Sequence, residues 1–234
     1  MFLHASIQWY YTLSVFLLCG VLLLAQKSKA DPLLNTDDAS ITAAHHCQLE
    51  SSYLFLKGGA SSYQITPACN LGQNFEVSLG YHATQDLDNV HGFSVQAKTV
   101  LKPMSNHWGV ATSLMLSRDE QSKQRSDLDW FFNVPMSFNL IDQRLGLNTN
   151  IGYQDGPDHV GLIRWGVATN YSLSDRFAIS AETYNQDRQS PFVQAAVNYS
   201  LIPNILVLEA SIGERLNAFR QRWFGLGLSF TPSF

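Results

Sequence analysis

Hydrophobic and polar residues alternate with a period of two along most of the chain from Cys47 onward. The run FEVSLGYH at residues 75–82 is one example, and comparable runs follow it to the C-terminus. Such a period places the apolar side chains on one face of a β-strand and the polar ones on the other. The alternation divides into about twelve segments of roughly ten residues, a length that suits tilted barrel strands. We therefore expect an all-β chain of about twelve strands, with ten as the alternative.

The two ends of the first expected hairpin each carry a cysteine. Cys47 and Cys69 are equidistant from Gly58, and the pair Gly58-Gly59 is a turn signal. A hairpin folded there brings the two cysteines opposite each other, so we expect a disulfide between them. The alternative is two free thiols. The return strand, at residues 62–67, has the weakest alternation of all the segments.

The connections between the segments alternate between short turns and longer, more charged loops. This order is typical of an outer-membrane barrel, in which short periplasmic turns alternate with external loops around an even number of strands. A soluble β-sandwich is the alternative, because it also uses alternating strands. Aromatic residues near the ends of the apolar faces favour an antiparallel transmembrane β-barrel. We expect these charged residues on its polar, lumen-facing side: Glu76, Lys98, Asp127, Asp129, Arg144, Arg164, Arg176, Glu182 and Glu209.

The first thirty residues differ from the rest of the chain. Residues 11–25 form an apolar run that is short for a membrane-spanning helix, and small residues precede the expected cleavage point after Ala30. We expect a signal peptide at 1–30, although the absence of Lys and Arg before the apolar run leaves an uncleaved anchor as the alternative. Residues 31–44 have weak periodicity and are expected to form a periplasmic tail or a lumen plug. The barrel then spans residues 45–234.

The composition narrows the possible functions. Charged residues make up 15% of the 234 residues, below the roughly 25% of soluble domains. The net charge of −4 and the pI near 5.9 argue against nucleic-acid binding. We expect no metal and no cofactor, because the cysteine and histidine spacings match no metal-binding motif.

The last strand resembles the C-terminal assembly signal of Gram-negative outer-membrane proteins. Its apolar residues alternate and an aromatic residue ends the chain: Phe224, Leu226, Leu228, Phe230 and Phe234. The resemblance implies insertion by the barrel-assembly machinery, with the lipid bilayer and lipopolysaccharide as surroundings. Pro232 departs from the usual ending, and because proline cannot donate to a strand ladder we expect the last three residues outside the barrel.

A second resemblance covers most of the expected mature chain. The segments CQLE at 47–50, PACN at 67–70, FEVSLG at 75–80 and LNTNIGY at 147–153 are similar to proteobacterial outer-membrane proteins. These are akin to the outer-membrane transporters associated with phenol-degradation gene clusters. The resemblance implies a barrel that passes small solutes, hydrophobic ones among them, and it transfers no catalytic residue.

Three functions remain open from the sequence. A passive channel or uptake porin for small solutes is favoured, and its inward arginines and carboxylates would set its selectivity. A plugged barrel with a structural or partner-binding role is the alternative. An outer-membrane lipid hydrolase is the third, but the sequence has no GxSxG or HExxH motif. Ser78 and His82 are also too far apart along one strand to hydrogen bond. We therefore do not expect an enzyme.

Overall fold

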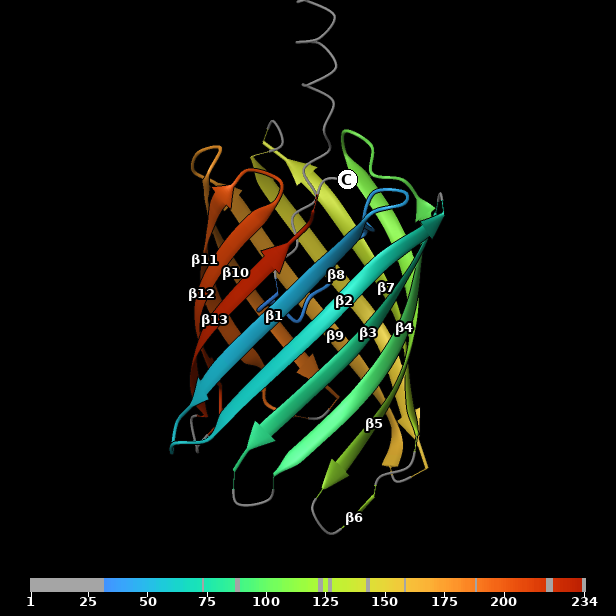
Figure 1. Cartoon of the computed structure of the whole chain (residues 1–234), viewed down its shortest axis with the longest axis vertical. Helices are drawn as coiled ribbons and strands as arrows, with labels where there is room; N and C mark the ends of the chain where they lie inside the picture. Colours follow the sequence, from blue (N-terminus) through green and yellow to red (C-terminus); the bar gives the residue numbers. More distant parts are fainter. Residues whose placement is uncertain are drawn as a thin grey trace, which may run out of the picture.

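The chain folds into a closed antiparallel β-barrel in this computed structural model, which describes residues 32–72, 74–86, 89–121, 124–125, 128–141, 144–157, 159–187, 189–217 and 221–232. Figure 1 shows the strands running obliquely around one central space. Their bounds are β1 (Cys47–Leu56), β2 (Ser61–Gly72), β3 (Phe75–Gln85), β4 (Val90–Lys102), β5 (Trp108–Gln121), β6 (Gln124–Arg125), β7 (Asp129–Leu140), β8 (Leu145–Gly156), β9 (His159–Ser172), β10 (Phe177–Gln186), β11 (Phe192–Ile202), β12 (Leu206–Arg215) and β13 (Arg222–Phe230).

Twelve long strands build the wall, which confirms the expected strand number. Each pairs with its neighbours in the chain, the pairing of β1 with β13 closes the ring, and β7 follows β5 directly. The two-residue β6 pairs only with the end of β5 and lies in the connecting loop. Closure removes the free sheet edges that would otherwise expose unpaired backbone groups. No helix among the described residues is long and apolar enough to cross a membrane.

The first hairpin forms as its glycines require. Gly58 and Gly59 in the turn between β1 and β2 have φ values of 103° and 94°, which glycine adopts without steric cost. The turn sets a register in which Cys47 is paired with Cys69 across the two strands. The two cysteines form a disulfide, as expected. The strand that the sequence marked as weakest, β2, is twelve residues long, because its pairing with β1 and β3 outweighs its weak alternation.

The apolar face of every long strand points outward. Leu79, Phe93, Ile151 and Ile212 are each more than half exposed, which no soluble β-sandwich core would allow. Aromatic side chains meet across neighbouring strands toward the end of the barrel that carries the longer loops: Tyr53, Phe55 and Phe224; Tyr63, Tyr81 and Phe93; Trp130 and Tyr153. An apolar band with aromatic residues near its edge fits a lipid bilayer.

The inward face is mainly polar, with many small or hydrogen-bonding side chains. Buried residues on it include Asn70, Glu76, Lys98, Ser113, Asn133, Ser137, Ser180, Glu182, Gln194, Asn198, Glu209, Ser211 and Ser229. The start of β1 and the end of β13 lie at the same end of the barrel (Figure 1). We take this end as periplasmic and the end with the loops after β3, β5, β10 and β12 as extracellular.

Candidate functional site in the lumen

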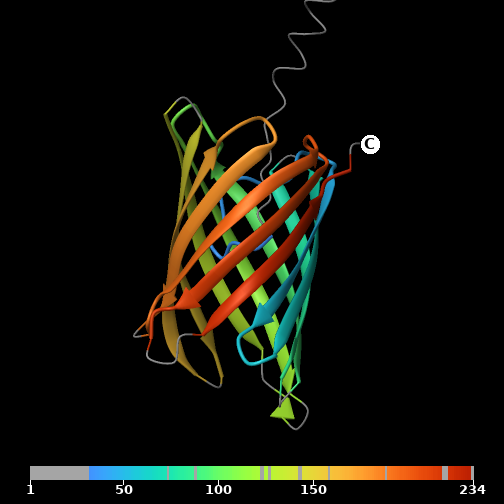
Figure 2. The same cartoon turned by 90° about the vertical axis from the view of Figure 1, so that its left-hand side faces the viewer.

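Residues 32–44, called the inner segment below, lie inside the barrel. Figure 2 shows this blue stretch of chain in the central space, behind the strands that face the viewer. It is hydrogen bonded to inward side chains of β12, β11, β10, β8, β7, β3 and β2. The chain then reaches the wall, where the backbone N–H of His45 donates to the carbonyl of Asn70 just before β1 begins. The inner segment therefore crosses the lumen rather than following one wall.

Three glutamates from well-separated strands bind backbone N–H groups of the inner segment. Glu182 on β10 accepts hydrogen bonds from Asn35 and Thr36, each at 2.9 Å. Glu209 on β12 accepts from Leu33 at 3.1 Å, and Glu76 on β3 accepts from Thr42 at 2.7 Å. All three carboxylates are buried. A buried carboxylate without partners is costly, so these amides stabilise the wall as well as the segment.

Neutral side chains complete the attachment of the inner segment. The carboxamide of Asn150 on β8 accepts from the N–H of Asp37 and donates to its carbonyl, at 2.7 and 2.8 Å. Gln194 and Asn70 donate to the carbonyls of Leu33 and Thr42. The inner segment has no regular secondary structure, so side chains of the wall supply the hydrogen-bond partners that its backbone groups would otherwise find in a neighbouring strand.

An ion pair attaches the middle of the inner segment to β4. Lys98 Nζ lies 2.7 Å from Asp37 Oδ1 and 3.7 Å from Asp38 Oδ1. Lys98 is only 5% exposed, and its cross-strand neighbour on β3 is the carboxylate Glu76. This cation offsets the cluster of carboxylates that the inner segment and the wall bring together.

Inward glycines leave the space that the inner segment occupies. A Cβ atom at Gly166 on β9 would lie 2.4 Å from Thr36 Oγ1, and its other two nearest atoms also belong to Thr36. A Cβ at Gly227 on β13 would meet Pro32 and Leu33 at about 3 Å. Any larger residue at these positions would displace the segment or move aside, so the wall and the segment are shaped to each other.

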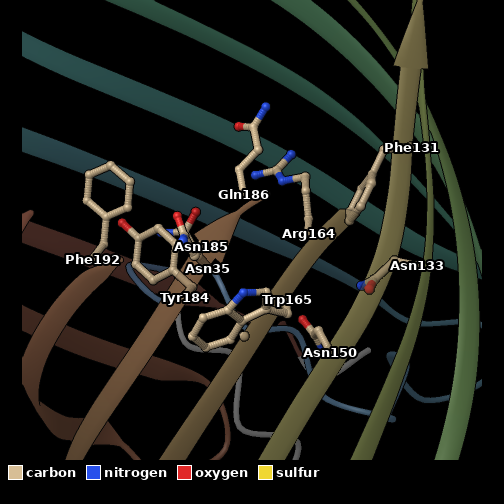
Figure 3. A pocket seen from close by; sticks show the side chains of 11 residues that line it. Asn35, Phe131, Asn133, Asn150, Arg164, Trp165, Tyr184, Asn185, Gln186 and Phe192 are labelled. Carbon is tan, nitrogen blue, oxygen red and sulfur yellow. The ribbon is translucent and has the colours of Figure 1, made fainter. Parts of the chain in front are cut away.

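A pocket opens beside the inner segment, toward the extracellular half of the lumen. Figure 3 shows its side chains, which come from β7, β8, β9, β10 and β11 and from Asn35 of the inner segment. Its cavity volume is about 90 Å³. The lining combines one cation, Arg164, with five carboxamides and the rings of Phe131, Tyr184 and Phe192. A small polar molecule that enters from the extracellular end meets this pocket before it reaches the inner segment.

Arginines and aromatic rings form a connected layer at this level. The guanidinium of Arg164 lies 4.8 Å from the centre of the Phe131 ring and donates to Gln154 Oε1 at 3.1 Å. Tyr184 and Phe192 are stacked with ring centres 5.0 Å apart, and Arg215 lies over Phe192 at 5.0 Å. Neither arginine is within ion-pair distance of a carboxylate among the described residues, since their contacts are carboxamides, a carbonyl and rings. Both cations therefore remain available to an anion.

The structure places the predicted lumen charges in different surroundings. Glu76, Lys98, Glu182 and Glu209 are buried in the wall against the inner segment, and Arg164 lines the pocket. Asp129 is half-buried at the first position of β7, whereas Asp127 and Phe234 lie outside the described residues.

Arg144 and Arg176 differ from this set. The alternation predicts them on the polar face of their strands, but β8 begins at Leu145 and β10 at Phe177. Both arginines lie in short periplasmic turns and are exposed. Each precedes the first residue of its strand by one position, and its carbonyl still accepts from the neighbouring strand, Arg144 from Ser172 and Arg176 from Ser200. Their side chains therefore lie at the rim of the barrel rather than beside the buried charges.

Several residues of the site carry no distinctive signal in the sequence. Asn133, Asn150 and Gln194 occupy ordinary polar positions of alternating strands, and Tyr184 falls on the polar face near the end of its strand. An aromatic residue at a polar position is the signal that could have marked Tyr184, as it marks Phe131, Phe192 and Trp223. The indole N–H of Trp223 donates to Gln194 Oε1 at 3.0 Å, so this ring also faces inward.

The family model of the uncharacterised conserved protein UCP029691 matches residues 19–231. The chain belongs to this family. No curated protein matches its sequence. The phenol-cluster resemblance therefore stays a prediction.

Solved structures share the fold at low sequence identity. The KdgM porin is 13% identical with a TM-score of 0.63, and the match covers 80% of this chain and 99% of the porin. The NanC porin is 12% identical with a TM-score of 0.61, covering 78% and 98%. Outer membrane phospholipase A from Escherichia coli is 10% identical with a TM-score of 0.50, covering 87% and 94%. The same barrel thus serves both porins and an enzyme, and the fold alone does not separate them.

Proposed function

We propose that the chain is a passive channel for small solutes in the outer membrane of a Gram-negative bacterium. The observation that carries this proposal is the closed barrel with an apolar outer face, a polar inner face and a lumen pocket above the inner segment. Polar lumens bordered by charged residues select solutes by size and charge. The fold shared with the KdgM and NanC porins supports this function.

The inner segment is the narrow part of this channel. It crosses the lumen from β12 to β2 on the periplasmic side of the pocket, so a solute that leaves the pocket has to pass beside it or displace it. Its attachment through hydrogen bonds to side chains, rather than through a strand ladder, allows it to detach without unfolding the barrel. In this proposal residues 1–30 are the removed signal peptide. Lipopolysaccharide and the barrel-assembly machinery are partners during insertion.

A plugged barrel with a structural or partner-binding role is the second candidate. The observation that favours it is the number of inward side chains that the inner segment occupies, among them Glu76, Glu182 and Glu209. A lipid hydrolase is less well supported. His82, the histidine nearest to a candidate serine in the sequence, is directed at Asp119 with Nε2 and Oδ1 3.3 Å apart.

Single-channel conductance in planar bilayers tests the proposal. The mature protein is compared with a variant that lacks residues 32–44, and heat-modifiable gel migration verifies that both barrels are folded. We expect small openings from the mature protein and larger ones from the deletion variant. Folded barrels that conduct in neither form, or only after the deletion, would overturn the passive channel and favour the plugged barrel.

A further inference from the structure

The lumen has an uneven distribution of satisfied and unsatisfied charge. Its buried carboxylates Glu76, Glu182 and Glu209 are engaged by N–H groups of the inner segment, and Lys98 is paired with Asp37. Arg164 and Arg215, by contrast, have no carboxylate partner among the described residues. An arginine that faces a low-dielectric space without a counter-ion favours an anion, and its planar guanidinium matches a carboxylate in two-point contact.

The pocket beside Arg164 has two further features that a ligand can satisfy. The rings of Phe131, Tyr184 and Phe192 line it. Arg164 lies over Phe131 and Arg215 over Phe192, and Tyr184 is stacked on Phe192, so a ligand ring would pack on the remaining face of Tyr184 and on the edges of its neighbours. Asn133 is only 4% exposed, and its Oδ1 atom is buried without a hydrogen-bond partner in the described protein. A buried carbonyl oxygen without a donor is unusual and costly, so a donor on a ligand would be stabilising there.

We infer that this pocket is a binding site for a small ring-bearing carboxylate that also has a hydroxyl group. The carboxylate binds Arg164, the ring packs on Tyr184 and its neighbours, and the hydroxyl donates to Asn133 Oδ1. Asn35 of the inner segment borders the same pocket, so a bound solute lies directly against the narrow part of the lumen. The inference deepens the proposed channel function and rests on it for its biological meaning, while the binding itself can be measured separately.

Two chemical sources share this ligand chemistry, namely aromatic hydroxy acids and sugar acids. Binding is measured by isothermal titration calorimetry on the detergent-solubilised mature barrel, with 3-hydroxybenzoate and glucuronate as the two probes. Benzamide serves as an uncharged ring, and benzoate as a ring acid without the hydroxyl. We expect at least one of the two hydroxy acids to bind on the order of tenfold more tightly than benzamide, because each charge-assisted hydrogen bond adds about that factor. We also expect 3-hydroxybenzoate to bind more tightly than benzoate.

The decisive variant is Arg164→Gln, matched by Arg222→Gln. Both remove one positive charge near the extracellular end of the barrel. Arg222, however, is exposed, paired with Glu214 at 3.0 Å and not part of the pocket. We expect Arg164→Gln to lose on the order of tenfold in affinity for the acid that binds. Arg222→Gln should bind like the unmodified barrel. Arg164→Lys, which keeps the charge but not the two-point geometry, should fall between them.

Several results would overturn the site. The first is equal affinity of the barrel for the hydroxy acids and for benzamide. The second is an equal loss of affinity for the acid in Arg164→Gln and Arg222→Gln. The third is no measurable binding of either acid to the folded barrel. If 3-hydroxybenzoate binds no more tightly than benzoate, the role of Asn133 is refuted. The readout is independent of conductance. A barrel that binds the acid through Arg164 but never conducts would refute the channel function and support the binding site. A barrel that conducts but does not bind the acid would refute the binding site and support the channel function.

Discussion

Glu182→Gln is the sharpest perturbation of the inner segment. The carboxylate of Glu182 accepts the backbone N–H groups of both Asn35 and Thr36, with its oxygens 2.9 to 3.1 Å from the two nitrogens. The substitution preserves the size of the side chain but replaces one acceptor oxygen with an NH₂ donor. When the remaining oxygen takes the Oε2 position it still accepts both amides, and the new donor faces the N–H group of Asn35, which keeps only its 3.1 Å contact.

The expected cost follows from these contacts. A hydrogen bond to a charged group contributes about 1.5–3 kcal/mol and a neutral one about 0.5–1.5 kcal/mol. The 2.9 Å bond from Asn35 is lost, the two bonds to the remaining oxygen become neutral, and the smaller cost of burying a neutral side chain offsets part of the loss. We therefore expect local opening of the segment to become easier by about 2 kcal/mol, which corresponds to about 30-fold in the opening equilibrium.

Amide hydrogen exchange in detergent measures this change directly. The amides of Asn35 and Thr36 should exchange about 30-fold faster. The amide of Thr42, which is bound by Glu76 at the other side of the lumen, should change much less. The same variant should show more frequent or larger openings in planar bilayers, because the inner segment narrows the lumen.

Glu214→Gln is the matched control. Glu214 lies near the end of β12, where it pairs with Arg222 and, within the part of the chain that the structure describes, forms no hydrogen bond with the inner segment. Two results would refute the reasoning. One is unchanged exchange of Asn35 and Thr36 in Glu182→Gln. The other is faster exchange throughout the strands, which would show a general loss of stability rather than release of the segment.

Three further predictions test the wall, the disulfide and the shape of the lumen. Cys47→Ser should leave the barrel assembled but lower the temperature at which it unfolds in a gel-shift assay, because a cross-link over this span contributes about 3 kcal/mol to stability. An unchanged unfolding temperature would contradict this. Ile151→Arg, on the lipid face, should lower the unfolding free energy in liposomes by about 2–4 kcal/mol, whereas Ile141→Arg in a turn should cost about 0–1 kcal/mol. Equal costs would argue against membrane embedding. Gly166→Ala should speed amide exchange at Thr36. Gly146→Ala should not, because the three atoms nearest to its new methyl group all belong to the Asn170 side chain. Equal exchange rates in the two variants would refute the fit between wall and segment.

The fold was readable in the sequence because a barrel wall is a local pattern repeated many times. Each strand of the wall has to present apolar side chains to lipid and polar ones to the lumen, so alternation appears in every long strand from β3 to β13. The disulfide was predictable for a similar reason, since a turn at Gly58 and Gly59 sets the register of the two strands beside it. Tertiary pairing sets the strand ends, and Arg144 and Arg176 show how the alternation continues into the turn that precedes a strand.

The sequence by itself indicated the polar face of each strand, but only the tertiary structure decided which side chains on that face meet. Glu182, Glu209 and Glu76 lie on β10, β12 and β3, and they come together through one irregular segment that has no periodicity to read. Contacts across a barrel depend on strand tilt and stagger, which are properties of the closed ring and not of any single strand. The same closure leaves Arg164 beside Phe131, Tyr184 and Asn133 in one pocket, although each is an ordinary inward position in its own strand.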